Sequence, residues 1–122
     1  MSEARRLHKI VLIEDDPDIA ALIEETLADV GHQVDVRTEL ADGPVNPDVA
    51  LVITDLVPLR VYDQVAARNW ISKVRARFPR AAVVVSTAHA PAGADALGAD
   101  AVVTKPFDIG RFAETVESLL DR

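Results

Sequence analysis

A chain of 122 residues, of which 49% are hydrophobic and 27% charged, has the length and composition of one globular domain, expected over residues 1–122. Its net charge of −7 argues against direct nucleic-acid binding, because such a surface needs clustered Lys and Arg to neutralise phosphates. No apolar run approaches the ~18 residues that a membrane helix requires, and the absence of cysteine excludes disulfides and thiolate metal sites. We therefore expect a cytoplasmic protein without membrane contact.

The first predicted elements are a buried strand and an amphipathic helix. Residues 10–13 are continuously apolar, which is typical of a parallel strand covered on both faces. Asp16 then provides an N-cap, Pro17 a first helical residue and Gly31 a C-terminal stop. Apolar residues follow Pro17 at helical spacing and predict one apolar face: Ile19, Leu22, Ile23, Leu27 and Val30.

The next segment holds two predicted strands and little helix. Residues 34–37 alternate between apolar and charged side chains, which suits a half-exposed edge strand. Gly43 and Pro44 fall in the connection that follows, so any second helix there is short or broken. Residues 49–54 predict another fully buried strand, which ends at Asp55.

A second amphipathic helix and a fourth strand come next. The helix is stopped by Pro79 and has one apolar face: Ala67, Trp70, Ile71, Val74 and Phe78. Its basic residues are expected on the solvated face rather than on a nucleic-acid surface: Arg68, Lys73, Arg75, Arg77 and Arg80. Residues 81–85 predict the strand, and Ser86 and Thr87 follow it.

The end of the chain predicts a short helix, a strand and a last full helix. Little more than a turn or two of helix fits before Gly98, and residues 101–103 predict a fifth strand. Asp108 can cap the last helix. The apolar face of this helix comprises Ile109, Phe112, Ala113, Val116, Leu119 and Leu120.

Polar residues stand at the ends of four predicted strands. Buried strands joined by helices indicate right-handed crossovers and a doubly wound parallel sheet. In such α/β sheets, functional sites collect at the carboxyl ends of the strands. The residues expected there are Glu14 and Asp15, Asp55, Thr87, and Lys105. Four chemically distinct groups at one edge predict a functional site.

The carboxylates at this edge indicate a metal site. Acidic residues near a helix N-terminus commonly serve as caps, and Asp16 is expected to keep that role. Asp55, however, should lie beside Glu14 and Asp15, and three converging carboxylates repel each other unless a hard cation relieves them. Mg²⁺ suits this group, because it binds through one or two carboxylates together with water and phosphate oxygens.

Asp55 is the best candidate nucleophile of this edge. A carboxylate can form an acyl phosphate, and phosphoryl transfer asks the protein mainly for positioning and charge neutralisation. Lys105 offers a positive charge for a phosphate oxygen, and Thr87 offers a hydroxyl hydrogen bond. Taken singly, each residue also has a structural explanation, as a turn residue, a strand-end lysine or a local cap. Together they supply the parts of one reaction.

With these residues the sequence resembles the response-regulator receiver domains of two-component signalling. The matching stretches are residues 11–19 (VLIEDDPDI), 48–56 (DVALVITDL), 84–88 (VVSTA), 98–100 (GAD) and 104–107 (TKPF). The resemblance spans nearly the whole chain. It implies a flavodoxin-like α/β fold, a doubly wound sheet of five parallel strands in the order 2-1-3-4-5.

The resemblance also implies the roles of the site residues. The implied Mg²⁺ ligands are Glu14, Asp15, Asp55 and the backbone carbonyl of Val57. Asp55 would be phosphorylated, Thr87 and Lys105 would contact the phosphate, and Lys105–Pro106 would be a cis peptide. The donor would be a histidine kinase or phosphotransfer protein, and the signal would pass by contact to an unknown downstream protein. Such a domain is no ordinary enzyme, although it assists its own phosphorylation and dephosphorylation.

The sequence departs from the family pattern outside the predicted chemistry. The position three residues before the lysine, usually aromatic, is Val102, and the segment between Thr87 and Gly98 is about one turn short. The second and fourth helices are therefore expected to be shortened. We expect phosphorylation to alter the loops beside the site more than the fifth strand. Partner contact is then expected at the first helix or over residues 61–78, with Trp70 as a reporter.

Two alternatives stay open at this point. A hydrolase of the haloacid dehalogenase class also phosphorylates an aspartate, but it needs a second Asp where this chain has Val57. A binding module could keep the fold and signal without phosphorylation, although such modules often lose the acceptor or the lysine. Nucleotide binding is disfavoured because no glycine-rich phosphate-binding motif occurs, and His8, His32 and His89 lack metal-ligand spacing.

Overall fold

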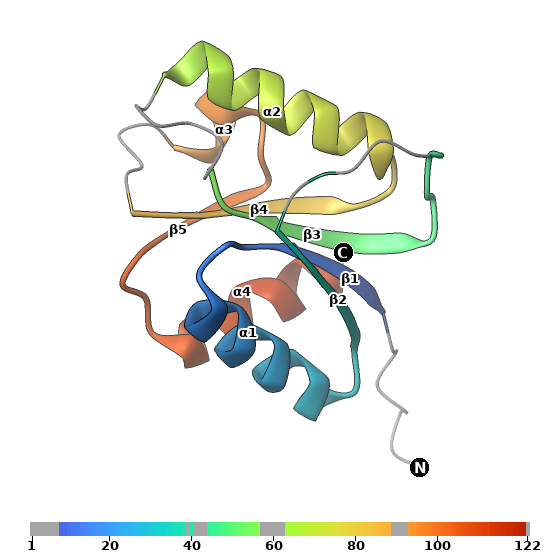
Figure 1. Ribbon diagram of the computed structural model, residues 1–122, viewed down its shortest axis with the longest axis vertical. Helices are drawn as coiled ribbons and strands as arrows, with labels where there is room; N and C mark the ends of the chain where they lie inside the picture. The colour runs from blue at the N-terminus through green and yellow to red at the C-terminus, as the bar shows by residue number, and fades with distance from the viewer. Residues whose placement is uncertain (1–7, 39, 41–43, 57–62, 89–92, 122) are drawn as a thin grey trace.

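Five parallel strands form one sheet in the order β2-β1-β3-β4-β5 in the computed structural model (Figure 1). They are β1 (Lys9–Ile13), β2 (Gln33–Arg37), β3 (Val49–Thr54), β4 (Ala82–Thr87) and β5 (Ala101–Thr104). The structure describes residues 8–38, 40, 44–56, 63–88 and 93–121. The predicted fold class and strand order are confirmed.

Four helices cover the two faces of the sheet within the described residues. They are α1 (Pro17–Val30), α2 (Gln64–Arg77), α3 (Ala94–Leu97) and α4 (Ile109–Leu120). In Figure 1, α1 and α4 lie on one face, and α2 and α3 on the other. None of the described residues between β2 and β3 is helical, so the helix after β3 carries the label α2. The helix between β4 and β5, expected as a shortened fourth helix, is α3. It has four residues, so the predicted shortening is confirmed there.

The apolar runs become strands because side chains on both faces of the sheet are buried. In β4, Val83 and Val85 belong to the core on the α2 and α3 side, whereas Val84 belongs to the core on the other side. The β4–β5 pairing extends to Thr87, opposite Thr104. Thr87 is therefore the last residue of β4 and not, as predicted, the residue that follows the strand.

The helices bury the apolar faces predicted for them, with one exception in α1. Ala20, Ile23 and Leu27 of α1 pack in the same core as Phe112 and Val116 of α4. Leu22 was expected on this apolar face, but it is 46% exposed. The buried positions 20, 23 and 27 define a narrower stripe, and residue 22 falls outside it.

The helix ends follow the predicted capping chemistry. A carboxylate oxygen of Asp16 accepts hydrogen bonds from the backbone N–H groups of Asp18 and Ile19, at 2.9 and 3.2 Å. Gly31 ends α1 with a φ of 110°, in the left-handed region where a side chain would be strained. Asp108 caps α4 by accepting from two backbone N–H groups of its first turn. The predicted bounds of α1 and α4 thus rest on observed hydrogen bonds.

Hydrogen bonds of Arg75 and Asp100 connect the short helix α3 to α2 and β4. The Arg75 side chain donates to the carbonyl oxygen of Gly98 through Nε and to Asp100 Oδ2 through Nη2, both at 3.0 Å. The same carboxylate oxygen accepts the backbone N–H of Val83 at 2.8 Å. One helical turn is too short to be stable alone, so tertiary contacts hold α3 in place.

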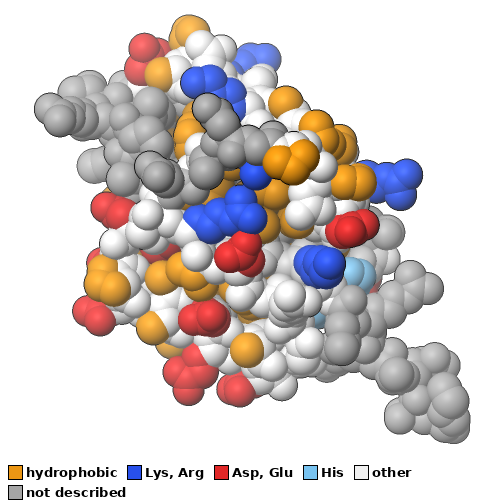
Figure 2. Space-filling view, turned by 45° about the vertical axis from the view of Figure 1, so that its right-hand side comes forward, with side chains coloured by type: hydrophobic (Ala, Val, Ile, Leu, Met, Phe, Trp, Pro, Cys, Tyr) orange, Lys and Arg blue, Asp and Glu red, His pale blue; other side chains and the backbone are white. Residues whose placement is uncertain are grey.

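Charge is divided between the two helical layers. Helix α1 contains four acidic residues and no basic one, whereas α2 contains four basic residues and no acidic one. Figure 2 shows this division on one face, where most acidic side chains lie in the lower part and most basic side chains in the upper part. Within the described residues, no helix has the length and apolarity needed to cross a membrane.

Candidate functional site

The predicted site residues meet at the carboxyl edge of the sheet. Glu14, Asp55 and Lys105 are each anchored by a backbone hydrogen bond to a neighbouring strand, which continues the ladder beyond the strand ends. Glu14 N–H donates to the carbonyl of Arg37 at 3.0 Å, and Asp55 N–H donates to that of Ile13 at 2.9 Å. Lys105 N–H donates to the carbonyl of Thr87 at 2.8 Å. Lys105–Pro106 is a cis peptide, as predicted.

The ammonium group of Lys105 joins two carboxylates of this edge. Its Nζ lies 2.8 Å from Glu14 Oε1 and 2.9 Å from Asp55 Oδ2. All three side chains are largely withdrawn from water, with 15% of Lys105, 1% of Glu14 and 12% of Asp55 exposed. The sequence predicts that Lys105 meets a phosphate oxygen at Asp55, but it does not predict the contact of Lys105 with Glu14.

Backbone amides hold the remaining carboxylate oxygens. Glu14 Oε2 accepts the N–H of Asp16 at 3.1 Å, and Asp55 Oδ1 accepts the N–H of Leu56 at 2.6 Å. Each carboxylate therefore has one oxygen on an amide and the other on the ammonium group. This arrangement fixes the orientation of both carboxylates before any ligand binds.

Three carboxylates are close enough to share one cation. Oxygen atoms of Glu14, Asp15 and Asp55 all lie within 4.8 Å of one another. Glu14 is buried, Asp55 is half-buried and Asp15 is exposed, so the cluster opens toward solvent on the Asp15 side. An all-oxygen donor set of this kind fits a hard divalent cation. Val57, whose carbonyl was the fourth predicted ligand, lies outside the described residues.

Burial changes the acid–base properties of Glu14 and Lys105. Burial raises the pKa of the Glu14 carboxyl above its ordinary value of 4.5; the hydrogen bond from Lys105 opposes this rise, and Asp55 adds to it. Burial by itself would lower the pKa of Lys105, but its hydrogen bonds to Glu14 and Asp55 raise that pKa above 10.5. Lys105 therefore stays charged at neutral pH, and Glu14 takes up a proton more readily than an exposed glutamate.

The raised pKa of Glu14 predicts a pH-dependent difference in stability between the wild type and Glu14→Gln. Between 4.5 and the raised value, the folded state binds the proton of Glu14 more tightly than the unfolded state does. The stability that this group contributes is therefore present below 4.5 and is lost as pH rises through the folded pKa. Urea unfolding across this range should show that the free energy of unfolding of the wild type rises relative to that of Glu14→Gln as the pH falls. A difference independent of pH would contradict the raised pKa.

Two hydrogen bonds behind Asp55 were not predicted from the sequence, although Trp70 was expected on an apolar helix face and as a reporter. Trp70 Nε1 donates to the hydroxyl of Thr54 at 2.9 Å, and that hydroxyl donates to the backbone carbonyl of Asp55 at 2.8 Å. The available signal was a polar residue at the end of a buried strand together with a tryptophan on the apolar face of the next helix. The N–H of an indole in such a place needs a hydrogen-bond acceptor.

The fold of this chain is that of solved response-regulator receiver domains. Solved structures of such domains superpose on nearly the whole chain. A response regulator from Thermotoga maritima is 17% identical, with a TM-score of 0.74, and the match covers 96% of this chain and 100% of that one. The non-phosphorylated HemR receiver domain from Leptospira biflexa is 22% identical, with a TM-score of 0.71 and coverage of 94% and 95%.

A third similar structure has a ligand in its description. The response regulator TrrA from Thermotoga maritima, in complex with Mg²⁺ and BeF, is 21% identical, with a TM-score of 0.67 and coverage of 93% and 99%. At these identities the likeness establishes the fold. No family model matches the chain, and no curated protein matches its sequence.

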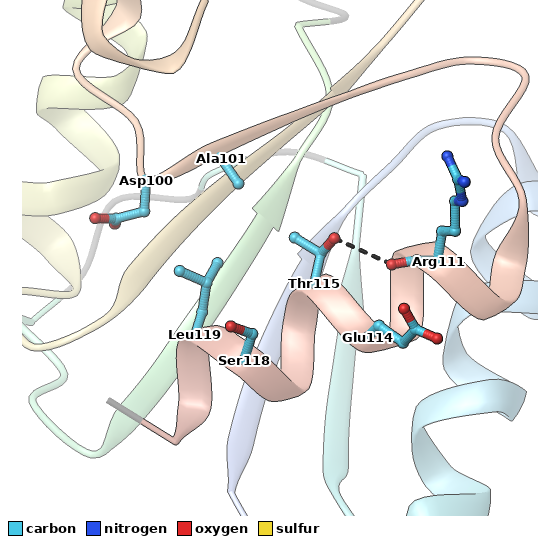
Figure 3. A pocket seen from close by; sticks show the side chains of 7 residues that line it. All are labelled: Asp100, Ala101, Arg111, Glu114, Thr115, Ser118 and Leu119. Carbon is cyan, nitrogen blue, oxygen red and sulfur yellow. Dashed lines mark hydrogen bonds between the residues drawn. The ribbon is translucent and has the colours of Figure 1, made fainter.

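A hollow elsewhere on the surface does not share the features of this edge. Figure 3 shows it between the start of β5 and one side of α4. Its lining residues are Asp100, Ala101, Arg111, Glu114, Thr115, Ser118 and Leu119. The lining belongs to the amino end of β5, whereas Glu14, Asp55 and Lys105 lie at the carboxyl edge of the sheet. We therefore take the carboxylate cluster, and not this hollow, as the candidate functional site.

Proposed function

We propose that this chain is a phosphoacceptor receiver that takes a phosphoryl group on Asp55 with Mg²⁺. One observation carries the proposal. At the carboxyl edge of a receiver fold, the Asp55 carboxylate lies 2.9 Å from a lysine ammonium and shares a cluster with two further carboxylates. A nucleophile, a cation site and a fixed positive charge are the parts that phosphoryl transfer to a carboxylate needs.

Each described residue has a defined part in the proposed transfer. A carboxylate oxygen of Asp55 forms a bond to the phosphorus of the donor, while the bond from phosphorus to the leaving group breaks and its electron pair departs with that group. Lys105 already contacts this carboxylate and can follow the charge onto a phosphate oxygen. Thr87, at the end of β4, offers a hydroxyl to another phosphate oxygen.

The acidic residues would hold the metal. Glu14, Asp15 and Asp55 would be its side-chain ligands, joined by the carbonyl of Val57 in the arrangement that the family resemblance implies. Bound Mg²⁺ would supply positive charge for the oxygens of the transferred group. In its absence Lys105 is the cation that contacts two of these carboxylates.

The proposed partners are proteins. The donor is a histidine kinase or a phosphotransfer protein, and a downstream protein reads the phosphorylated state by contact. Direct nucleic-acid binding is not part of the proposal, because the net charge is −7 and the basic residues of α2 are balanced by an acidic α1.

Incubation with acetyl phosphate tests this function. The wild type should gain one phosphoryl mass in the presence of Mg²⁺ and none when the metal is chelated, as measured by intact-mass spectrometry. The added group should be released by hydroxylamine, which cleaves an acyl phosphate but leaves a phosphoserine intact. No mass gain under either condition would refute the proposal and favour a module that signals without phosphorylation.

The adjacent residues Asp15 and Asp16 provide a matched pair of variants for the metal site. Asp15→Ala should weaken Mg²⁺ binding strongly, because its carboxylate belongs to the cluster of three. Asp16→Ala should retain the metal and lose about 1 kcal/mol of stability, because Asp16 caps α1. Calorimetric titration with Mg²⁺ and urea unfolding measure the two effects. The opposite pattern would show that the acidic residues are assigned one position out of register.

A further inference from the structure

A chain of two hydrogen bonds connects α2 to the backbone of Asp55. The indole of Trp70 is a donor only, and it donates to Thr54 Oγ1 at 2.9 Å. The hydroxyl of Thr54 has a single proton, which it donates to the carbonyl oxygen of Asp55 at 2.8 Å. Thr54 is fully buried at the end of β3, so water does not compete for these bonds. Each bond orients the next one.

With these two hydrogen bonds, every polar atom of Asp55 has a hydrogen-bond partner. The Asp55 N–H is held by the carbonyl of Ile13 in β1, and its carbonyl is held by Thr54. Its two carboxylate oxygens are held by Leu56 N–H and by Lys105. The partners of the Asp55 N–H and of Oδ2 lie at the edge of the sheet. The partner of Oδ1 is the next residue in the chain, Leu56. Through Thr54, the carbonyl of Asp55 has a hydrogen-bond path to α2.

We propose that Thr54 and Trp70 are positioning residues for Asp55, and that α2 responds to the state of Asp55 through them. This inference rests on the proposed function, because it needs a phosphoryl group on Asp55. A phosphoryl group bound to the Asp55 carboxylate, or a cation beside it, would pull on the backbone of Asp55. Thr54 is hydrogen-bonded to the carbonyl oxygen of that same residue. Any displacement of the Asp55 carbonyl must then change the Thr54–Trp70 hydrogen bond. By linkage, loss of that bond must change how readily Asp55 accepts its ligand.

The position of Trp70 agrees with this role. Trp70 is only half-buried, and it packs against the core on the α2 and α3 side. A rearrangement at its indole therefore has a path to the surface of α2. Val102, by contrast, offers no polar group to relay a change toward β5. The result would be an output through α2, which lies within residues 61–78, one of the two places, with the first helix, where partner contact is expected.

Removal of the Thr54 hydroxyl tests the inference with two independent readouts. Trp70 is the sole tryptophan of the chain, so its fluorescence reports on this position alone. In the wild type, Mg²⁺ with beryllofluoride should change that fluorescence. In Thr54→Val, the fluorescence change should be largely lost, and the rate of labelling by acetyl phosphate at saturating Mg²⁺ should fall about tenfold. Thr54→Ser, which keeps the hydroxyl, should restore both.

Three further proteins separate positioning from general loss of stability. Trp70→Phe keeps an aromatic ring without the N–H donor, and its labelling rate should fall as in Thr54→Val. Val116→Ala destabilises the other core, at a buried position in α4, and should label at the wild-type rate. Asp55→Asn should show no labelling and serves as the blank.

The outcomes distinguish this inference from the proposed function. If the wild type neither gains a phosphoryl group nor responds to beryllofluoride, the proposed function fails, and the inference falls with it. If the wild type is labelled, but Thr54→Val matches it in either rate or fluorescence change, the proposed function stands and the inference is overturned.

Discussion

Replacement of Asp55 by asparagine is expected to abolish phosphorylation by acetyl phosphate. The substitution keeps the size of the side chain and one oxygen for the N–H of Leu56, but it removes the anionic nucleophile that faces Lys105. Asp55 follows β3, the central strand of the sheet, and its side chain is more exposed than that of Glu14, the other carboxylate that contacts Lys105. Intact-mass analysis after incubation with Mg²⁺ should show one phosphoryl group on the wild type and none on the variant.

Asp63→Asn is the matched control for this experiment. Asp63 is exposed at the N-terminus of α2, where its carboxylate accepts the N–H of Val65 at 2.9 Å. Asparagine is an equally good cap, so this variant should fold and label as the wild type does. Equal labelling of the Asp55→Asn protein would remove Asp55 as the acceptor.

Replacement of Lys105 by methionine is expected to cause the largest loss of stability among single changes at the site. The variant keeps an apolar stem but leaves the Glu14 carboxylate, 1% exposed, and the Asp55 carboxylate, 12% exposed, without their counter-charge. Leaving buried charges unpaired typically costs a few kcal/mol, so we expect a loss of about 3 kcal/mol in the free energy of unfolding at neutral pH. Urea unfolding without added metal measures this loss.

Two controls accompany the Lys105→Met experiment. Lys73→Met makes the same replacement at an exposed position of α2 and should change the stability by less than about 0.5 kcal/mol. The loss in Lys105→Met should also shrink as the pH is lowered, because protonation of Glu14 removes one of the unpaired charges. A stability equal to that of the wild type at neutral pH would show that the ion pairs of Lys105 contribute nothing net.

Much of the fold could be predicted from the sequence because its signals are local. The runs that became β1, β3 and β4 are apolar on both faces, and only a doubly covered parallel sheet explains such runs. Asp16 and Gly31 mark the ends of α1 through their own hydrogen bonds and backbone angles. These features depend on neighbours in the chain, so one sequence suffices to find them.

The errors and omissions concern contacts between distant segments. Leu22 has helical spacing with the buried residues of α1, but the width of the buried stripe depends on what packs against it, and this residue stays exposed. The contact of Lys105 with Glu14 joins residues that follow β5 and β1, two strands that are not neighbours in the sheet. The contact of Trp70 with Thr54 joins a helix to a strand. The predicted strands and helices place these residues in the same region of the fold. Which of their atoms form hydrogen bonds depends on the three-dimensional packing.

The hydrogen bond between Arg75 and the end of α3 has a consequence for local unfolding of the molecule. A helix of one turn does not persist without its tertiary contacts, and its end is held by a side chain that belongs to α2. Any local unfolding that withdraws the second half of α2 therefore releases α3 in the same event. The two helices form one cooperative opening unit, and their amide hydrogens exchange with solvent through shared fluctuations. A partner that captures the opened end of α2 would therefore find α3 released as well.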